Sequence, residues 1–69
     1  MAYQPRVGKT RWRHLVAGQQ QRNREMIVDL ERLLTTAATA EARNAILQLI
    51  IAAQANLLDL AELARMSDA

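Results

Sequence analysis

The second half of the chain places apolar residues at helical spacing on two adjacent faces, and this pattern limits the folds open to it. One stripe consists of Ile46, Leu49, Ile50, Ala53, Leu57, Leu60 and Ala64. A second stripe beside it consists of Leu47, Ile51, Gln54, Leu58 and Ala61. This spacing predicts a helix over about residues 40–66. Because such a helix is apolar around most of its circumference, it must be covered on more than one side, and one partner helix cannot do that.

A first helix is predicted over about residues 10–37. Its second half carries one apolar face, formed by Met26, Ile27, Leu30, Leu33, Leu34 and Ala37. Its first half has a single apolar patch, formed by Trp12, Leu15 and Val16. Residues 19–25 contain no apolar side chain, so this stretch can bury little beyond aliphatic stems.

The predicted helices are bounded by recognisable start and turn signals. Pro5 and Gly8 predict that residues 1–9 form a flexible basic arm, and Thr10 is a candidate N-cap for the first helix. The second helix is expected to begin after Thr39, which can cap it and is followed by an acid in the first turn. A short turn between helices of similar length makes them antiparallel neighbours.

Length and composition indicate how such a hairpin is stabilised. A chain of 69 residues buries little surface by itself. It contains no Cys and one His, which excludes disulfides, thiolate metal sites and His-rich metal sites. Oligomerisation is then the remaining way to stabilise so small a fold. We therefore expect an all-α antiparallel helical hairpin, one domain over residues 1–69, that dimerises into a four-helix bundle. The predicted dimer interface is Leu47, Ile50, Ile51, Gln54, Leu57, Leu58 and Ala61. Gln54 either fixes the register inside this seam or lies at its rim and reaches water.

Charge is divided unevenly along the chain. The first 24 residues contain six Lys or Arg and no acid, whereas the remainder contains seven acids and three Arg. A cationic segment attracts anionic partners, and aromatic and Arg side chains dominate binding hot spots. The predicted partner-binding residues are Tyr3, Arg6, Lys9, Arg11, Trp12 and Arg13. Trp12 can equally close the open end of the hairpin near Leu63, Ala64 and Met66, and the bases can equally form a solvated face.

The sequence contains few residues of the kinds that catalytic sites use. His14 is the only His, and Gly8-Lys9-Thr10 lacks the earlier Gly and the strand of a phosphate-binding loop. The acids lie on helical faces without convergence, so we expect a non-enzyme with no catalytic residue, cofactor or metal. The alternative to a protein-binding role is a small basic nucleic-acid-binding protein that uses residues 6–24, with phosphate contacts from its bases and stacking by Trp12.

No membrane association or secretion is expected. The most apolar stretch, residues 45–64, contains Gln48, Gln54, Asn56, Asp59 and Glu62. This is too polar for a predicted membrane span. The basic start is not followed by the apolar segment and cleavage site of a secretory signal, so a cytoplasmic protein is expected.

The chain resembles a known group of small helical proteins. Its basic segment YQPRVGKTRWRH, its Gln- and Arg-rich first helix and its Ala- and Leu-rich second helix are similar to those of the small phage-encoded quorum-sensing anti-activators of Mu-like Pseudomonas phages. The resemblance implies a homodimer of helical hairpins in the cytoplasm of the host bacterium. It also implies binding to a LuxR-type quorum-sensing activator, which blocks its DNA binding, and inhibition of the type IV pilus assembly ATPase.

Overall fold

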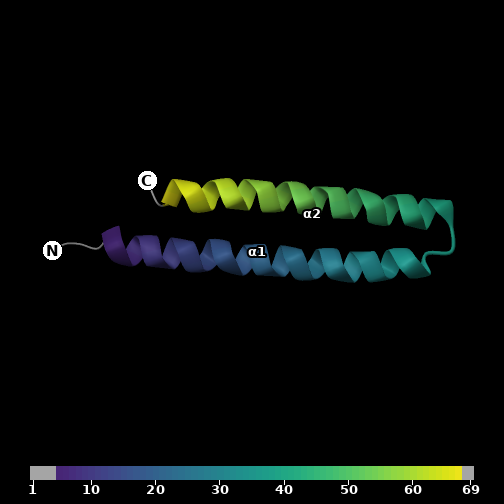
Figure 1. Ribbon diagram of the computed structural model, residues 1–69, viewed down its shortest axis with the longest axis horizontal. Coiled ribbons are helices and arrows are strands. Elements are labelled where there is room, and N and C mark those ends of the chain that lie inside the picture. Colours follow the sequence, from purple (N-terminus) through teal and green to yellow (C-terminus); the bar gives the residue numbers. More distant parts are fainter. Residues whose placement is uncertain (1–4, 68–69) are drawn as a thin grey trace.

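The computed structural model describes the backbone of residues 5–67 and the side chains of residues 11–66. Two long helices form one antiparallel hairpin: α1 spans Pro5–Thr36, and α2 spans Ala40–Ser67. The turn lies at one end of the molecule, and at the other end the first turns of α1 project past the last turn of α2 (Figure 1). The all-α helical hairpin predicted from the sequence is confirmed, and the predicted helix over residues 40–66 matches α2 closely.

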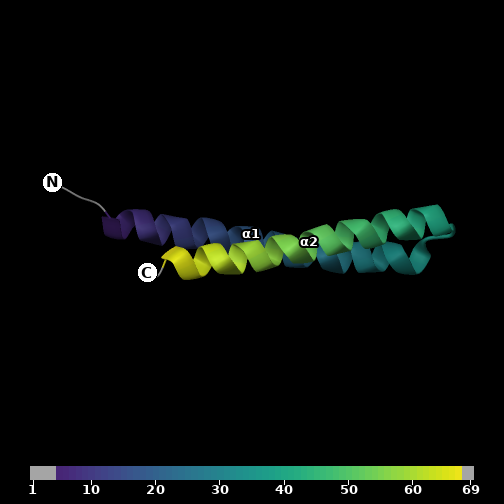
Figure 2. The same cartoon turned by 90° about the horizontal axis from the view of Figure 1, so that it is seen from above.

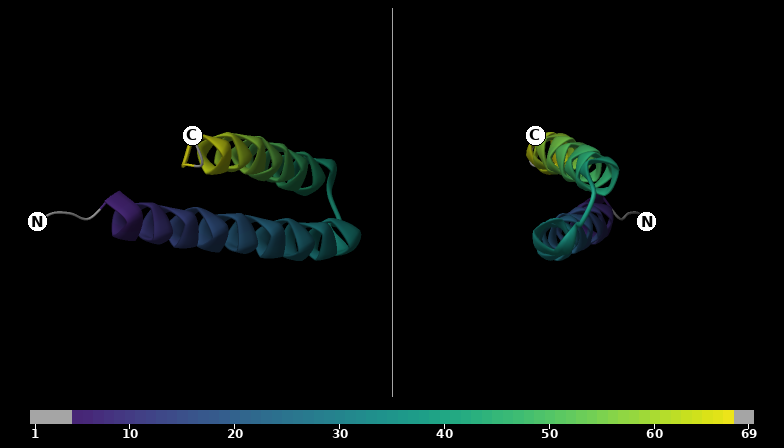
Figure 3. Two further views of the ribbon diagram at one scale, coloured as in Figure 1. Left: turned by 60° about the vertical axis from the view of Figure 1, so that its left-hand side comes forward. Right: turned by 90° about the vertical axis from the view of Figure 1, so that its right-hand side faces the viewer.

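The hairpin is a thin rod. Its extents are 60 × 15 × 12 Å and its radius of gyration is 16.6 Å. A compact domain of the same length has a radius of gyration of about 11 Å. The turned views show the two helices winding past each other in one layer, with nothing packed above or below them (Figures 2 and 3). Each helix therefore has only one neighbour within the described chain.

The interface between α1 and α2 follows an alternating spacing of four and three residues. On α1 and just after it, the covered positions are Val16, Gln20, Asn23, Ile27, Leu30, Leu34 and Ala37. On α2 they are Ile46, Ile50, Ala53, Leu57, Leu60 and Ala64. This alternation is the seam of an antiparallel coiled coil. Gly18 and Leu63 are also half-buried beside the seam.

The predicted apolar faces are wider than the surface that the hairpin covers. Met26, Leu33 and Leu49 were assigned to these faces, yet their side chains are 43%, 54% and 55% exposed. Each of them lies one position before a seam residue. A single neighbouring helix covers the seam and leaves such flanking positions open, which is the physical reason for the difference.

The start of α1 differs from the sequence prediction. The helix begins at Pro5, so residues 5–9 are helical where the sequence predicts an arm, and Thr10 lies inside the helix instead of capping it. Proline is well suited to the first helical position, because its fixed φ is already helical and its missing N–H would have had no intrahelical acceptor. At the other end, α1 ends at Thr36, one residue before the predicted boundary.

Hydroxyl groups organise the turn. The Thr39 Oγ1 accepts a hydrogen bond from the Ala42 N–H at 3.1 Å, and its carbonyl accepts one from the Arg43 N–H at 3.0 Å. These two bonds confirm Thr39 as the N-cap of α2. The hydroxyls of Thr35 and Thr36 donate to carbonyls three residues earlier, at 2.7 and 2.9 Å. They thereby tighten the last turn of α1.

Candidate protein-interaction surfaces

Trp12 connects the two helices at the open end of the hairpin. Its indole Nε1 donates a hydrogen bond to the carbonyl of Leu63 at 3.3 Å. The side chain nevertheless remains 41% exposed. The closing role considered for Trp12 from the sequence is therefore confirmed. Part of the ring stays available to a partner.

Three of the predicted partner-binding residues, Arg11, Trp12 and Arg13, do not share one face of α1. Arg11 and Arg13 are both exposed on either side of Trp12 in α1. Successive residues in an α-helix point about 100° apart, so these three side chains leave α1 in three directions. A partner that contacts all three must wrap around the end of α1.

The remaining members of that group lie near the start of the chain. Tyr3 is outside the described residues. Arg6 and Lys9 lie in the helical backbone of α1, upstream of the residues whose side chains are described. Their common helix places these bases on the same segment as Arg11 and Arg13.

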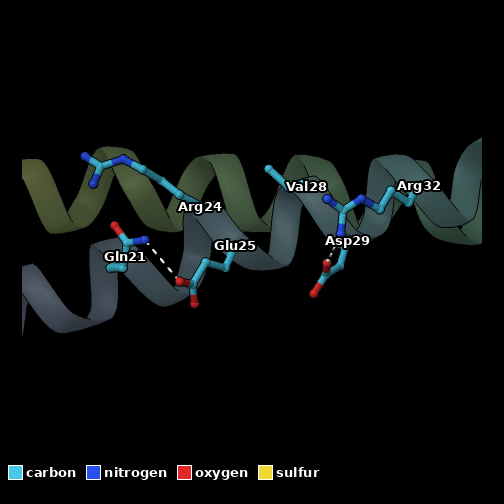
Figure 4. A pocket seen from close by; sticks show the side chains of 6 residues that line it. All are labelled: Gln21, Arg24, Glu25, Val28, Asp29 and Arg32. Carbon is cyan, nitrogen blue, oxygen red and sulfur yellow. Dashed lines mark hydrogen bonds and ion pairs between the residues drawn. The ribbon is translucent and has the colours of Figure 1, made fainter.

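An open hollow of about 300 Å³ lies on the outer surface of α1. Its walls are the side chains of Gln21, Arg24, Glu25, Val28, Asp29 and Arg32 (Figure 4). Gln21 Nε2 donates to Glu25 Oε2 at 3.1 Å, and Arg32 Nη1 lies 3.4 Å from Asp29 Oδ1. Because these partners are three or four residues apart on one helix, the pairs are ordinary surface interactions.

The hairpin exposes more large apolar side chains than it buries. Among residues 11–66, only Val16, Leu30, Ile50 and Ala53 are buried. The exposed large apolar residues are Trp12, Leu15, Met26, Val28, Leu33, Leu47, Leu49, Ile51, Leu58 and Met66. Large exposed apolar patches are typical of protein–protein or membrane interaction sites.

One of these exposed surfaces is the outer stripe of α2, defined here as Leu47, Ile51, Gln54, Leu58 and Ala61. All five residues are exposed, and Leu58 is 74% exposed. Two other residues of the predicted dimer interface lie elsewhere. Ile50 is 8% exposed in the hairpin seam, and Leu57 is half-buried at another seam position. These two side chains are already largely covered by α1 of the same chain. Their place in the four-three spacing of α2 indicates this position in the hairpin seam.

A second exposed surface is the Trp12 edge, defined here as Trp12, Met26, Leu33 and Leu49. All four are exposed, and each precedes a position of the four-three repeat. The hydrogen bond from Trp12 to Leu63 joins equivalent flanking positions of the two helices, which places this edge along one side of the hairpin. The outer stripe of α2 flanks the seam on the other side. Sequence reasoning missed this edge because it assigned three of its members to the hairpin core.

The described residues contain no cluster of metal-binding side chains. Between residues 11 and 66, no three His, Asp or Glu side chains come together, and His14 is exposed. By length and composition alone, the described helix Ala40–Met66 is long and apolar enough to cross a membrane. Its polar residues therefore do not exclude a span as the sequence prediction assumed, although one such helix is weak evidence for a span.

Comparison of the chain with protein-family models, with curated proteins and with solved structures gave no match. Similarity therefore assigns the chain to no family. Its function has to be inferred from the exposed surfaces of the hairpin and from the charges around them.

Proposed function

We propose that this protein is a non-enzymatic inhibitor that acts as a homodimer of helical hairpins and blocks its partner by occlusion. The observation that carries the proposal is the large exposed surface of the hairpin, on which the described residues place more large apolar side chains than they bury. The hairpin exposes 5360 Å² of accessible surface. A compact monomer of 7.8 kDa exposes about 4,400 Å². The difference of about 1,000 Å² resembles the area of about 800 Å² that each partner covers in a standard protein interface.

The outer stripe of α2 suits contact with a second copy. Its apolar residues are spaced almost symmetrically about Gln54, with Ile51 and Leu47 on one side and Leu58 and Ala61 on the other. If two α2 helices cross antiparallel at Gln54, a twofold axis at that point pairs Leu58 with Ile51 of the second copy. The two Gln54 amides then meet, and each can donate to the other. The resulting assembly is a four-helix bundle.

The partner proposed for this dimer is a LuxR-type quorum-sensing activator in a bacterial host, as the resemblance of the sequence implies. The pilus assembly ATPase is the second partner that the same resemblance implies. The basic start of the chain supports an acidic binding surface on a partner. Arg11, Arg22 and Arg24 are exposed and make no hydrogen bond or ion pair with the described part of the chain, so their charges remain available.

The test compares two double substitutions that change the net charge equally. Arg11→Glu with Arg13→Glu alters the open end, whereas Arg32→Glu with Arg43→Glu alters the turn end. Each takes the formal net charge from +2 to −2, because two positive charges become two negative ones. We expect the first variant to lose binding to a purified LuxR-type activator and the second to retain it, with both remaining folded by circular dichroism.

The same variants distinguish the proposed inhibitor from the alternative, a nucleic-acid-binding protein. A nucleic-acid-binding protein would bind generic DNA with a steep dependence on salt, and the open-end variant would lose that binding. If the wild-type chain binds generic DNA and neither candidate protein, the proposed inhibitor function is wrong. If both double variants bind the activator as tightly as wild type, the open end is only a solvated face.

A further inference from the structure

The seam between α1 and α2 is not uniformly apolar. Between Val16 and Ile27, the two seam positions of α1 are Gln20 and Asn23, and both are half-buried. Beyond this polar layer, the seam of α1 is apolar again up to the turn. The closed half is defined here as residues 27–53, and the open half as residues 11–22 together with 57–66. Of the side chains buried among residues 11–66, Leu30, Ile50 and Ala53 lie in the closed half and Val16 lies in the open half.

Asn23 carries a buried side-chain oxygen in this layer that has no hydrogen-bond partner in the described part of the chain. Its Nδ2 donates to the carbonyl of Gln19 at 2.9 Å. Its Oδ1 is buried and accepts no hydrogen bond from any described residue. Rotating the amide by half a turn would place two oxygen acceptors together, so the orientation is fixed by the contact with Gln19. A buried acceptor without a donor favours any state in which water reaches it.

We propose that the polar layer at Asn23 divides the hairpin into two units, and that the open half separates and recloses while the closed half stays paired. Opening exposes the Asn23 Oδ1 to water and, among the described residues, uncovers the buried Val16 and the half-buried Leu57, Leu60, Leu63 and Ala64. The closed half keeps the seam that contains Leu30, Ile50 and Ala53. Local opening of this kind is expected where a segment contributes few buried apolar contacts.

The opening has a direct consequence for the exposed end of the molecule. Trp12 loses its hydrogen bond to Leu63 when the helices part, so its ring and the neighbouring bases become free to rearrange on a partner.

Hydrogen exchange of the full chain tests the proposal at fixed protein concentration. In the wild type, we expect amides of the open half to exchange at least about tenfold faster than those of the closed half, which corresponds to about 1.4 kcal/mol. Asn23→Leu should slow exchange in the open half about tenfold, because it removes the buried acceptor and adds apolar contact. Asn23→Ala, which removes the acceptor without filling the space, should slow it by a smaller factor. Asn56→Leu is the matched control, since Asn56 is exposed on α2.

The single Trp gives a second readout, because Trp12 reports the open half alone whereas circular dichroism reports both helices. In the wild type, the fluorescence transition should precede the circular dichroism transition on addition of urea, and in Asn23→Leu the two should approach each other. The proposal is overturned if both halves of the wild type exchange as one unit with coincident transitions. It is also overturned if neither Asn23 variant slows the open half, or if Asn56→Leu slows it equally.

Discussion

Replacing Leu58 with Asp distinguishes a lone hairpin from a dimer built on the outer stripe of α2. Leu58 is 74% exposed, so in a monomer the change removes almost no contact. Substitutions at such surface positions usually alter the free energy of unfolding by no more than about 0.5 kcal/mol, and the lower helix propensity of Asp adds about as much again. A monomer should therefore lose about 1 kcal/mol at most.

The consequence is much larger if Leu58 is covered by a second copy. Burying a Leu side chain contributes roughly 2 kcal/mol, and a symmetric dimer loses this contribution twice, about 4 kcal/mol in all. That loss alone weakens the dimer Kd by nearly a thousandfold. The cost of burying an unpaired carboxylate is added to it. We therefore expect Leu58→Asp to remain helical at high protein concentration but to sediment as a monomer, or to unfold, where the wild type is a dimer.

Sedimentation and thermal melts over a range of protein concentrations provide the measurement, and Gln48→Asp provides the control. Gln48 is an exposed polar residue of α2 outside the outer stripe, so the same new charge there should leave the dimer intact. A wild-type chain that sediments as a well-folded monomer, with a melting temperature independent of concentration, would refute the reasoning. An unchanged Kd for Leu58→Asp would show that any dimer uses another surface.

Two further predictions concern single hydrogen bonds, both measured at fixed protein concentration. Thr39→Ala removes the N-cap acceptor of the Ala42 N–H and should lower the free energy of unfolding by about 1 kcal/mol. This loss corresponds to a fall in melting temperature of about 4–8 °C. Thr35→Ala is the control and should have a smaller effect. Trp12→Phe keeps an aromatic ring but removes the donor to Leu63, so it should cost about 1 kcal/mol in thermal melts while retaining partner capture. Loss of capture without loss of stability would assign the indole N–H to the partner instead.

The hairpin could be predicted from the sequence because its determinants are local. The four-three spacing from Ile46 to Ala64 requires a helix with one apolar seam, and Thr39 marks where that helix begins. The indole contact of Trp12 near Leu63 also follows from antiparallel pairing of helices with similar lengths. These features depend on periodicity and chain reversal, which a single sequence contains.

The width of the seam and the start of α1 could not be predicted in the same way. Met26 and Leu33 are apolar and adjacent to seam residues, so periodicity alone does not decide whether they are covered. Their exposure depends on how many helices surround α1. Pro5 is ambiguous for a different reason, since proline is common both in extended segments and at the first position of a helix. Asn23 was placed only in a polar stretch, because its burial depends on the register between the helices.

The two exposed apolar surfaces divide the proposed tasks of dimerisation and partner binding between opposite sides of the seam. A twofold interface uses the same surface of both copies, so a dimer through the outer stripe of α2 leaves two Trp12 edges uncovered. Leu58→Asp then removes dimerisation without altering the basic end. Arg11→Glu with Arg13→Glu alters that end without touching the outer stripe. We expect Leu58→Asp to lose the dimer but still bind the partner weakly, and the Arg11→Glu, Arg13→Glu variant to keep the dimer but fail to bind. The weaker binding of Leu58→Asp would then follow from the loss of bivalent attachment. It would require no contact between Leu58 and the partner.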